Sequence, residues 1–183
     1  MAETANELGI RFGGHVPADV GLLHALEMGQ ETFDHLDGYV EYLRTLDAEQ
    51  VDEVALRNVV GLTVSSGAWV VPTMVLWETL YGIPEPEELS AFPELQYMPG
   101  NTVDSWARAH VQRRAVDGFD LDAAARWIDA RMRVLEALND GGARILMGTD
   151  APQQYSVPGF SLHREIAPAY DHAQRFFLEV RLL

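Results

Sequence analysis

The sequence contains no cysteine, which excludes disulfide bonds and thiolate metal ligands. It is also poor in basic residues: lysine and arginine together number 13, against 28 aspartates and glutamates, and the net charge is −15. A charge of this sign repels phosphate backbones and anionic lipid surfaces. We therefore expect neither nucleic acid nor a membrane as a partner.

Long hydrophobic runs are missing as well. The longest apolar runs, such as Ala68–Pro72, have the length of a strand and not of a membrane span. The first residues, Met1–Glu7, are acidic and polar, which does not fit a secretory signal. At 183 residues the chain has the size of one domain with its own core. We expect a single domain over residues 1–183 and a cytoplasmic location.

Short apolar runs predict the strands of a parallel sheet. The clearest run, Ile145–Met147, leads through Gly148 and Thr149 to a single carboxylate, Asp150. Buried parallel strands have this continuous apolar character, because both of their faces are covered. The strands predicted in this way cover residues 10–12, 31–36, 69–74 and 145–147.

Amphipathic stretches, most of them closed by a glycine, separate the predicted strands. Helices are predicted at residues 1–8, 18–28, 47–66, 102–116 and 120–140, with a last one from Phe160. Strands that alternate with helices predict an α/β fold with right-handed crossovers. The repeat is interrupted at about residues 77–119 by a proline-rich insertion, which is either a lid or binding loop or a surface excursion without a role.

Three polar residues stand at the ends of predicted strands: His15, His35 and Asp150. If the strands are parallel neighbours, these residues share one edge of the sheet, where α/β barrels carry their chemistry. Two imidazoles and a carboxylate suit a divalent metal such as zinc. A bound metal lowers the pKa of a water molecule to about 7, and a carboxylate beside it can transfer the proton.

Each of these residues also has a structural interpretation. A histidine after a strand is often a hydrogen-bonded loop residue, and an aspartate before Ala-Pro can be a turn residue or a helix cap. His24 and His110 fall inside predicted helices and are expected at the surface, and His163 is expected on an ordinary helix face. The four tryptophans are expected to pack in the core or a lid: Trp69, Trp77, Trp106 and Trp127.

Three ordered segments resemble the second half of the amidohydrolase superfamily, in its imidazolonepropionase-like and Xaa-Pro-dipeptidase-like branch. They are Gly14–Pro17, Glu31–Leu36 and Gly148–Pro152, the last followed by Pro158–Glu165. The resemblance implies a partial (β/α)8 TIM barrel, roughly strands five to eight, with a helical insertion after strand seven. It further implies that His15 and His35 are metal ligands after strands five and six. Asp150 would be the strand-eight aspartate that binds metal and shuttles the proton.

The sequence departs from this family in two places. The family's His-X-His pair after strand one, and its bridging lysine or glutamate after strand four, are nowhere in the chain. The tail at residues 167–183 does not resemble the family's continuation. We expect at most one zinc ion from this chain alone. The expected activity is metal-dependent hydrolysis of a C–N bond (amide, peptide or cyclic amide) in a small-molecule or dipeptide-like substrate.

Two other interpretations stay open. A half-barrel leaves unpaired strand edges and a bare inner face, so we expect a homo-oligomer or a partner chain to cover them. Such a chain can act through association alone, without catalysis. In the weaker alternative, the chain is an unrelated α/β protein in which His15, His35 and Asp150 are structural.

Overall fold

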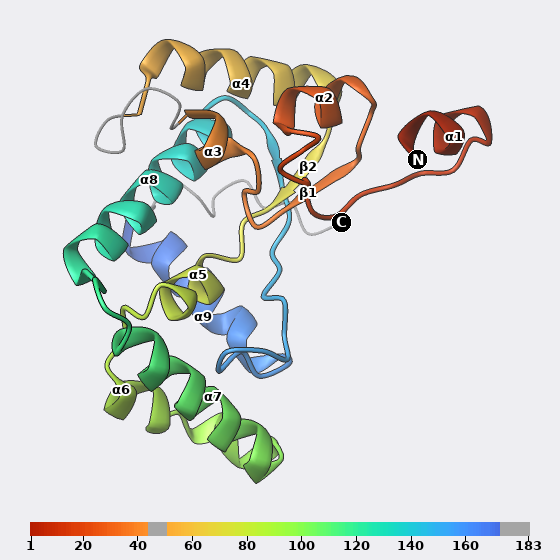
Figure 1. Ribbon diagram of the computed structural model, residues 1–183. Helices are drawn as coiled ribbons and strands as arrows, with labels where there is room; N and C mark the ends of the chain where they lie inside the picture. The colour runs from red at the N-terminus through yellow and green to blue at the C-terminus, as the bar shows by residue number, and fades with distance from the viewer. Residues whose placement is uncertain (44–50, 173–183) are drawn as a thin grey trace. The chain divides into compact units, whose positions relative to one another are not determined.

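The computed structural model describes residues 1–43 and 51–172 (Figure 1). The chain divides into two compact units. Unit 1 comprises Met1–Pro72 and Asp129–Leu146, and unit 2 comprises Thr73–Ile128 and Met147–Leu183. A single domain over residues 1–183 stays a prediction. Within the described residues, none of the helices has the length and apolar character that crossing a membrane requires.

Unit 1 contains a three-stranded parallel sheet in the order β1-β2-β3. The strands are β1 (Thr32–Asp34), β2 (Trp69–Val71) and β3 (Arg144–Ile145). In their register, Phe33 pairs with Val70, which pairs with Ile145. No strand forms at the predicted residues 10–12; an isolated parallel bridge joins Gly14 to Phe33 of β1, and the Glu31 N–H donates to the Phe12 carbonyl at 2.9 Å. Parallel pairing is confirmed for the other three predicted strands, whereas the partial TIM barrel stays a prediction.

Four helical segments of unit 1 bury apolar side chains: α2 (Leu22–Glu27), α3 (Tyr39–Leu43), α4 (Glu53–Ser66) and the second half of α8 (Leu121–Asp140). Helix α1 (Ala2–Glu7) buries no residue. Both α2 and α3 contact α4. The most deeply buried apolar residues of this core are Phe33, Leu36, Tyr39, Val59, Val70, Val134 and Leu138.

Helix α4 begins later than the sequence predicts. The expected cap, Asp47, lies outside the described residues, and the helix begins at Glu53. Asp52 is the actual N-cap: its Oδ1 accepts hydrogen bonds from the backbone N–H groups of Val54 and Ala55 at 2.8 and 3.1 Å. The predicted end is confirmed, since Gly67 closes the helix with a left-handed φ of 70°.

Unit 2 is helical in its described part. It contains α5 (Met74–Leu80), α6 (Pro86–Ser90), the 3-10 helix η2 (Pro93–Tyr97), α7 (Gly100–Arg114), the first half of α8, and α9 (Phe160–His172). Helix α5 contacts α9, and α6 contacts α7 (Figure 1). Leu89, Trp106, Tyr155 and Val157 form a buried apolar cluster.

The predicted elements differ from the structure at several points after residue 69. The third strand ends at Val71, directly before Pro72, as the inability of proline to donate to the ladder predicts; the residues up to Met74 are not part of it, because α5 follows at once. The predicted insertion has one helix; the structure adds α6 and η2, which begin at Pro86 and Pro93, where proline presets the helical φ. His110 is not at the surface: it is fully buried, and its Nε2 donates to the Pro84 carbonyl at 2.9 Å.

We predict that Asp52→Ala lowers the free energy of unfolding by about 1 kcal/mol, because two amides at the start of α4 lose their acceptor. Urea unfolding followed by circular dichroism measures the change. Asp129→Ala, an exposed position in the middle of α8, is the control and is expected to cause no loss. Equal losses in the two variants would contradict the assigned cap.

Candidate functional site

The first site residue, His35, follows directly after β1 in a left-handed backbone conformation with φ 62°. Its backbone N–H donates to the Val71 carbonyl at 2.7 Å, so it extends the pairing of β1 with β2 by one residue. The side chain is buried. A left-handed conformation at a residue other than glycine costs on the order of 1–3 kcal/mol. Such conformations cluster at functional sites, where the backbone fixes the orientation of a side chain.

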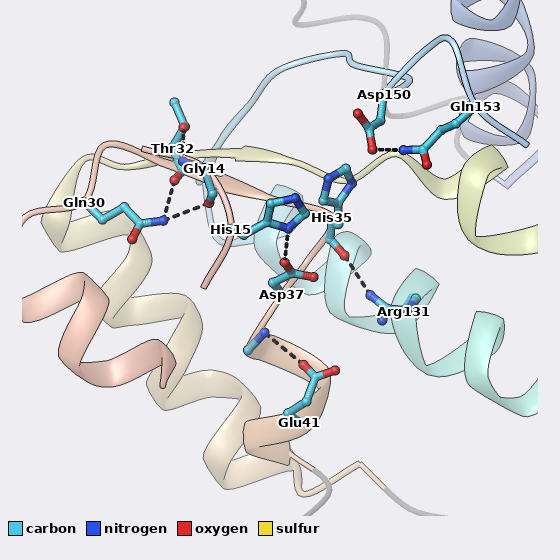
Figure 2. A network of polar contacts seen from close by, with 11 residues as sticks. Gly14, His15, Gln30, Thr32, His35, Asp37, Glu41, Arg131, Asp150 and Gln153 are labelled. Carbon is cyan, nitrogen blue, oxygen red and sulfur yellow. Dashed lines mark hydrogen bonds and ion pairs between the residues drawn. The ribbon is translucent and has the colours of Figure 1, made fainter. Parts of the chain in front are cut away.

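Arg131 supports this strained residue from α8. Its Nη1 donates to the backbone carbonyl of His35 at 2.7 Å (Figure 2), and the side chain is only 1% exposed. A hydrogen bond from a charged group is stronger than one between neutral groups. Arg131 therefore helps to hold the left-handed backbone at His35, and with it the direction of the imidazole.

The second site residue, His15, lies against His35. Its ring centroid is 4.6 Å from that of His35, with the two rings tilted by 33° (Figure 2). His15 Nδ1 lies 2.7 Å from the Asp37 carboxylate. In a neutral imidazole this contact makes Nδ1 the proton donor and leaves the lone pair on Nε2, the tautomer that binds metal through Nε2.

Gln30 fixes the backbone that carries His15. Its side-chain amide donates to the carbonyls of Gly14 and Thr32 at 2.9 and 2.8 Å (Figure 2). The backbone at Gly13 lies so close to Thr32 of β1 that a Cβ at Gly13 would collide with Thr32 Oγ1. The glycine that precedes the Gly14-His15 pair is therefore required by packing.

Asp150 belongs to unit 2 and is exposed, with a left-handed φ of 51°. The Gln153 side-chain amide donates to its Oδ2 (Figure 2). Around it the loop closes on itself, because Ser156 Oγ donates to the Thr149 carbonyl at 3.1 Å and Gln153 bridges to Ser156. Asp150 thus precedes the turn that Gln154 and Tyr155 form, and its own loop orients its carboxylate. Both interpretations of its role stay predictions.

Two residues at the start of α5 are not predicted from the sequence. Thr73 is buried and has a left-handed φ of 48°, as His35 and Asp150 have at their strand ends. Glu165 of α9 accepts hydrogen bonds from the backbone amides of Met74 and Val75 at 2.6 and 2.9 Å. Thr73 gave no signal in the sequence. Glu165 lies in the segment that resembles the amidohydrolases, but nothing marked it as buried.

The buried Glu165 carboxyl has a pKa of about 7, raised from its ordinary value of 4.5. Burial is the main cause, and the charge of Glu78 adds to it, while the two backbone hydrogen bonds work in the opposite direction. Burial also raises the pKa of Glu78. The start of α5 is therefore held by a carboxyl whose charge changes near neutral pH.

The structure brings His15, His35 and Asp37 together in unit 1, whereas Asp150 belongs to unit 2. Within residues 1–43 and 51–172, no three His, Cys, Asp or Glu side chains gather closely enough to hold a metal ion. Two adjacent imidazoles, one of them oriented by a carboxylate, fit two ligands of a divalent metal. The three-ligand set and the identity of the metal stay predictions.

Solved structures that are similar to this chain include two hydrolases. A bottromycin amidohydrolase aligns with a TM-score of 0.69 and 28% identity, over 96% of this chain and 39% of its own. A Xaa-Pro dipeptidase, crystallised with methionine in its active site, aligns with a TM-score of 0.49 and 16% identity, over 93% of this chain and 31% of its own. No protein-family model and no curated protein matches. The chain therefore spans well under half of either structure, and the first agrees with the predicted amidohydrolase resemblance at a coarse level.

We predict that Glu165 makes the protein less stable as pH rises. A pKa raised on folding favours the protonated form, so this contribution is complete below pH 4.5 and is lost as pH rises to about 7. Urea unfolding at about pH 5 and pH 8 measures the loss, which Glu165→Gln should reduce. Glu87→Gln, at an exposed position of α6, is the control. The same pH dependence in wild type and Glu165→Gln would contradict the assignment.

Proposed function

We propose that this chain carries part of the catalytic centre of a metal-dependent hydrolase that cleaves C–N bonds with an activated water molecule. The observation that supports it most is the pair His15 and His35. His15 follows the bridge residue Gly14 and His35 follows β1, and their ring centroids lie 4.6 Å apart, close enough for both imidazoles to bind one ion. The 28% identity with a bottromycin amidohydrolase, over 96% of this chain, supports the same class of reaction.

In this proposal His15 and His35 would hold the ion through imidazole nitrogens, and Asp150 would be the third ligand. A divalent ion, with zinc favoured, would supply one thing: it lowers the pKa of a water molecule to about 7. The Asp150 carboxylate would take a proton from the water whose oxygen bonds to the carbonyl carbon and would deliver it to the nitrogen of the breaking C–N bond, which departs as an amine. The substrate is a small amide, a cyclic amide or a dipeptide-like molecule. The non-catalytic alternative, a chain that acts through self-association or a partner chain, gains no support from these comparisons.

Asp37 has a separate role in the proposed centre. By accepting a hydrogen bond from Nδ1 of His15, it fixes the tautomer and the direction of an imidazole that is 69% exposed. An exposed side chain without such a partner would sample several rotamers. A carboxylate behind a metal-binding histidine typically strengthens metal binding by orienting the ring.

We predict that the full chain binds zinc and that His15→Ala, His35→Ala and Asp150→Ala each weaken binding by about tenfold or more. Competition with a chelating dye measures the affinity, and elemental analysis measures the zinc content. His24→Ala is the control, because His24 lies on α2 beside Glu27 and not in the proposed centre. Absence of zinc from the wild type, or unchanged affinity in all three variants, would refute the proposed metal centre.

A second prediction concerns Asp37→Ala. We expect zinc affinity to fall about 10-fold to 100-fold, because the His15 ring loses its orientation. Nitrogen chemical shifts of the metal-free protein should show His15 moving away from the tautomer protonated at Nδ1. Glu41→Gln is a matched control, since Glu41 is a nearby carboxylate that accepts from the Gly38 amide at 2.9 Å and does not contact His15 (Figure 2). An unchanged tautomer in Asp37→Ala would contradict this role.

A further inference from the structure

The loop that carries Asp150 has an unusual backbone. Asp150, Gln154 and Tyr155 all adopt left-handed conformations, with φ of 51°, 47° and 67°. Residues other than glycine hold such conformations only where the surrounding structure fixes them. The hydrogen bonds of Gln153 and Ser156 tie this loop to itself, so its position must depend on contacts with other elements of unit 2.

Tyr155 supplies the main apolar contact. The side chain is only 3% exposed, and its ring packs against Trp106 and His110 of α7, with centroid distances of 5.8 and 6.4 Å. Val157, also buried, joins the same cluster together with Leu89 of α6. Two residues of the Asp150 loop are therefore inserted among the helices of the insertion.

Arg164 of α9 adds a polar contact to the same loop. Its Nη2 donates to the Tyr155 carbonyl at 3.1 Å, and its Nη1 forms an ion pair with Glu94 of η2 at 2.5 Å. The guanidinium also lies over the ring of Phe92, 3.7 Å from its centroid. One arginine thus links the left-handed backbone at Tyr155 to two residues of the insertion.

The insertion that receives Tyr155 is itself tied together. Helix α6 contacts α7 (Figure 1), and His110 in the middle of α7 donates to the Pro84 carbonyl. Near the end of α7, Arg114 donates to the Gly82 carbonyl at 2.7 Å and pairs with Glu85 at 2.6 Å. The chain before α6 is therefore joined to α7 at more than one point, which constrains the residues that pack around Tyr155.

We propose that α6, η2 and α7 form a brace for the Asp150 loop and that Tyr155 is the positioning residue through which the brace acts on Asp150. The proposal rests on the proposed function, because it takes the Asp150 carboxylate as the group that must be placed. It assigns the insertion at residues 77–119 a role that differs from both a lid and an excursion without function. Tyr155 touches neither substrate nor metal; it fixes the turn that presents the carboxylate.

Amide hydrogen exchange of the metal-free full chain tests the brace. Tyr155→Ala and Trp106→Leu remove the contact from its two sides, and both should accelerate exchange at residues 149–153 by about tenfold or more, with α4 unchanged. Tyr155→Phe keeps the ring and should exchange like wild type. So should Val116→Ala, which removes a 62% exposed apolar side chain from the same insertion but outside α6, η2 and α7. If Tyr155→Ala fails to fold, the exchange rates of residues 149–153 in Trp106→Leu test the brace instead. Wild-type exchange at residues 149–153 in the folded variants would overturn the proposal.

Zinc affinity tests whether the brace acts through Asp150. Tyr155→Ala should weaken zinc binding by about tenfold in the wild-type background and have no further effect in Asp150→Ala. If Tyr155 acts only through Asp150, the effects of the two mutations on the binding free energy are not additive. Equal weakening in both backgrounds would overturn the positioning role. If Asp150→Ala itself leaves zinc affinity unchanged, Asp150 is not a ligand of the proposed centre, and hydrogen exchange alone then tests the brace.

Discussion

The left-handed backbone at the strand ends is the constraint on which the candidate site depends. His35 after β1, Thr73 after β2 and Asp150 beyond β3 all have positive φ, although none is a glycine. Each conformation is unfavourable by itself and needs support from elsewhere in the chain. Arg131 donates to the His35 carbonyl, and Glu165 accepts from the two amides that follow Thr73. The directions of the side chains at these ends thus depend on contacts that are distant in the sequence.

That dependence explains what could be predicted from the sequence and what could not. The parallel strands, the Gly67 cap and the start of α9 at Phe160 follow from local patterns of apolar residues, glycine and proline, and the structure confirms them. The nearness of His15 and His35 follows from parallel pairing of the segments that precede them. Arg131 and Glu165 are different, since each contacts a backbone group about ninety or more positions away, which no local pattern encodes.

The prediction for His110 fails for a related reason. The position of His110 within a predicted helix predicts a surface residue. In the structure it shares the buried face of α7 with Trp106 and donates a hydrogen bond to the Pro84 carbonyl. Helix faces are assigned by what packs on them, and here the packing comes from Tyr155 in a distant loop. The contact between the Asp37 carboxylate and His15 could not be predicted from the sequence either, because the two residues are 22 positions apart.

The central claim is that His15 and His35 bind one metal ion together. X-ray absorption spectroscopy at the zinc edge of the zinc-loaded full chain tests it most directly, because imidazole nitrogen gives a distinct scattering pattern at about 2.0 Å from zinc. The account predicts two imidazole ligands in the wild type and one in His15→Ala. A spectrum with oxygen ligands only, or one that does not change in His15→Ala, would contradict it.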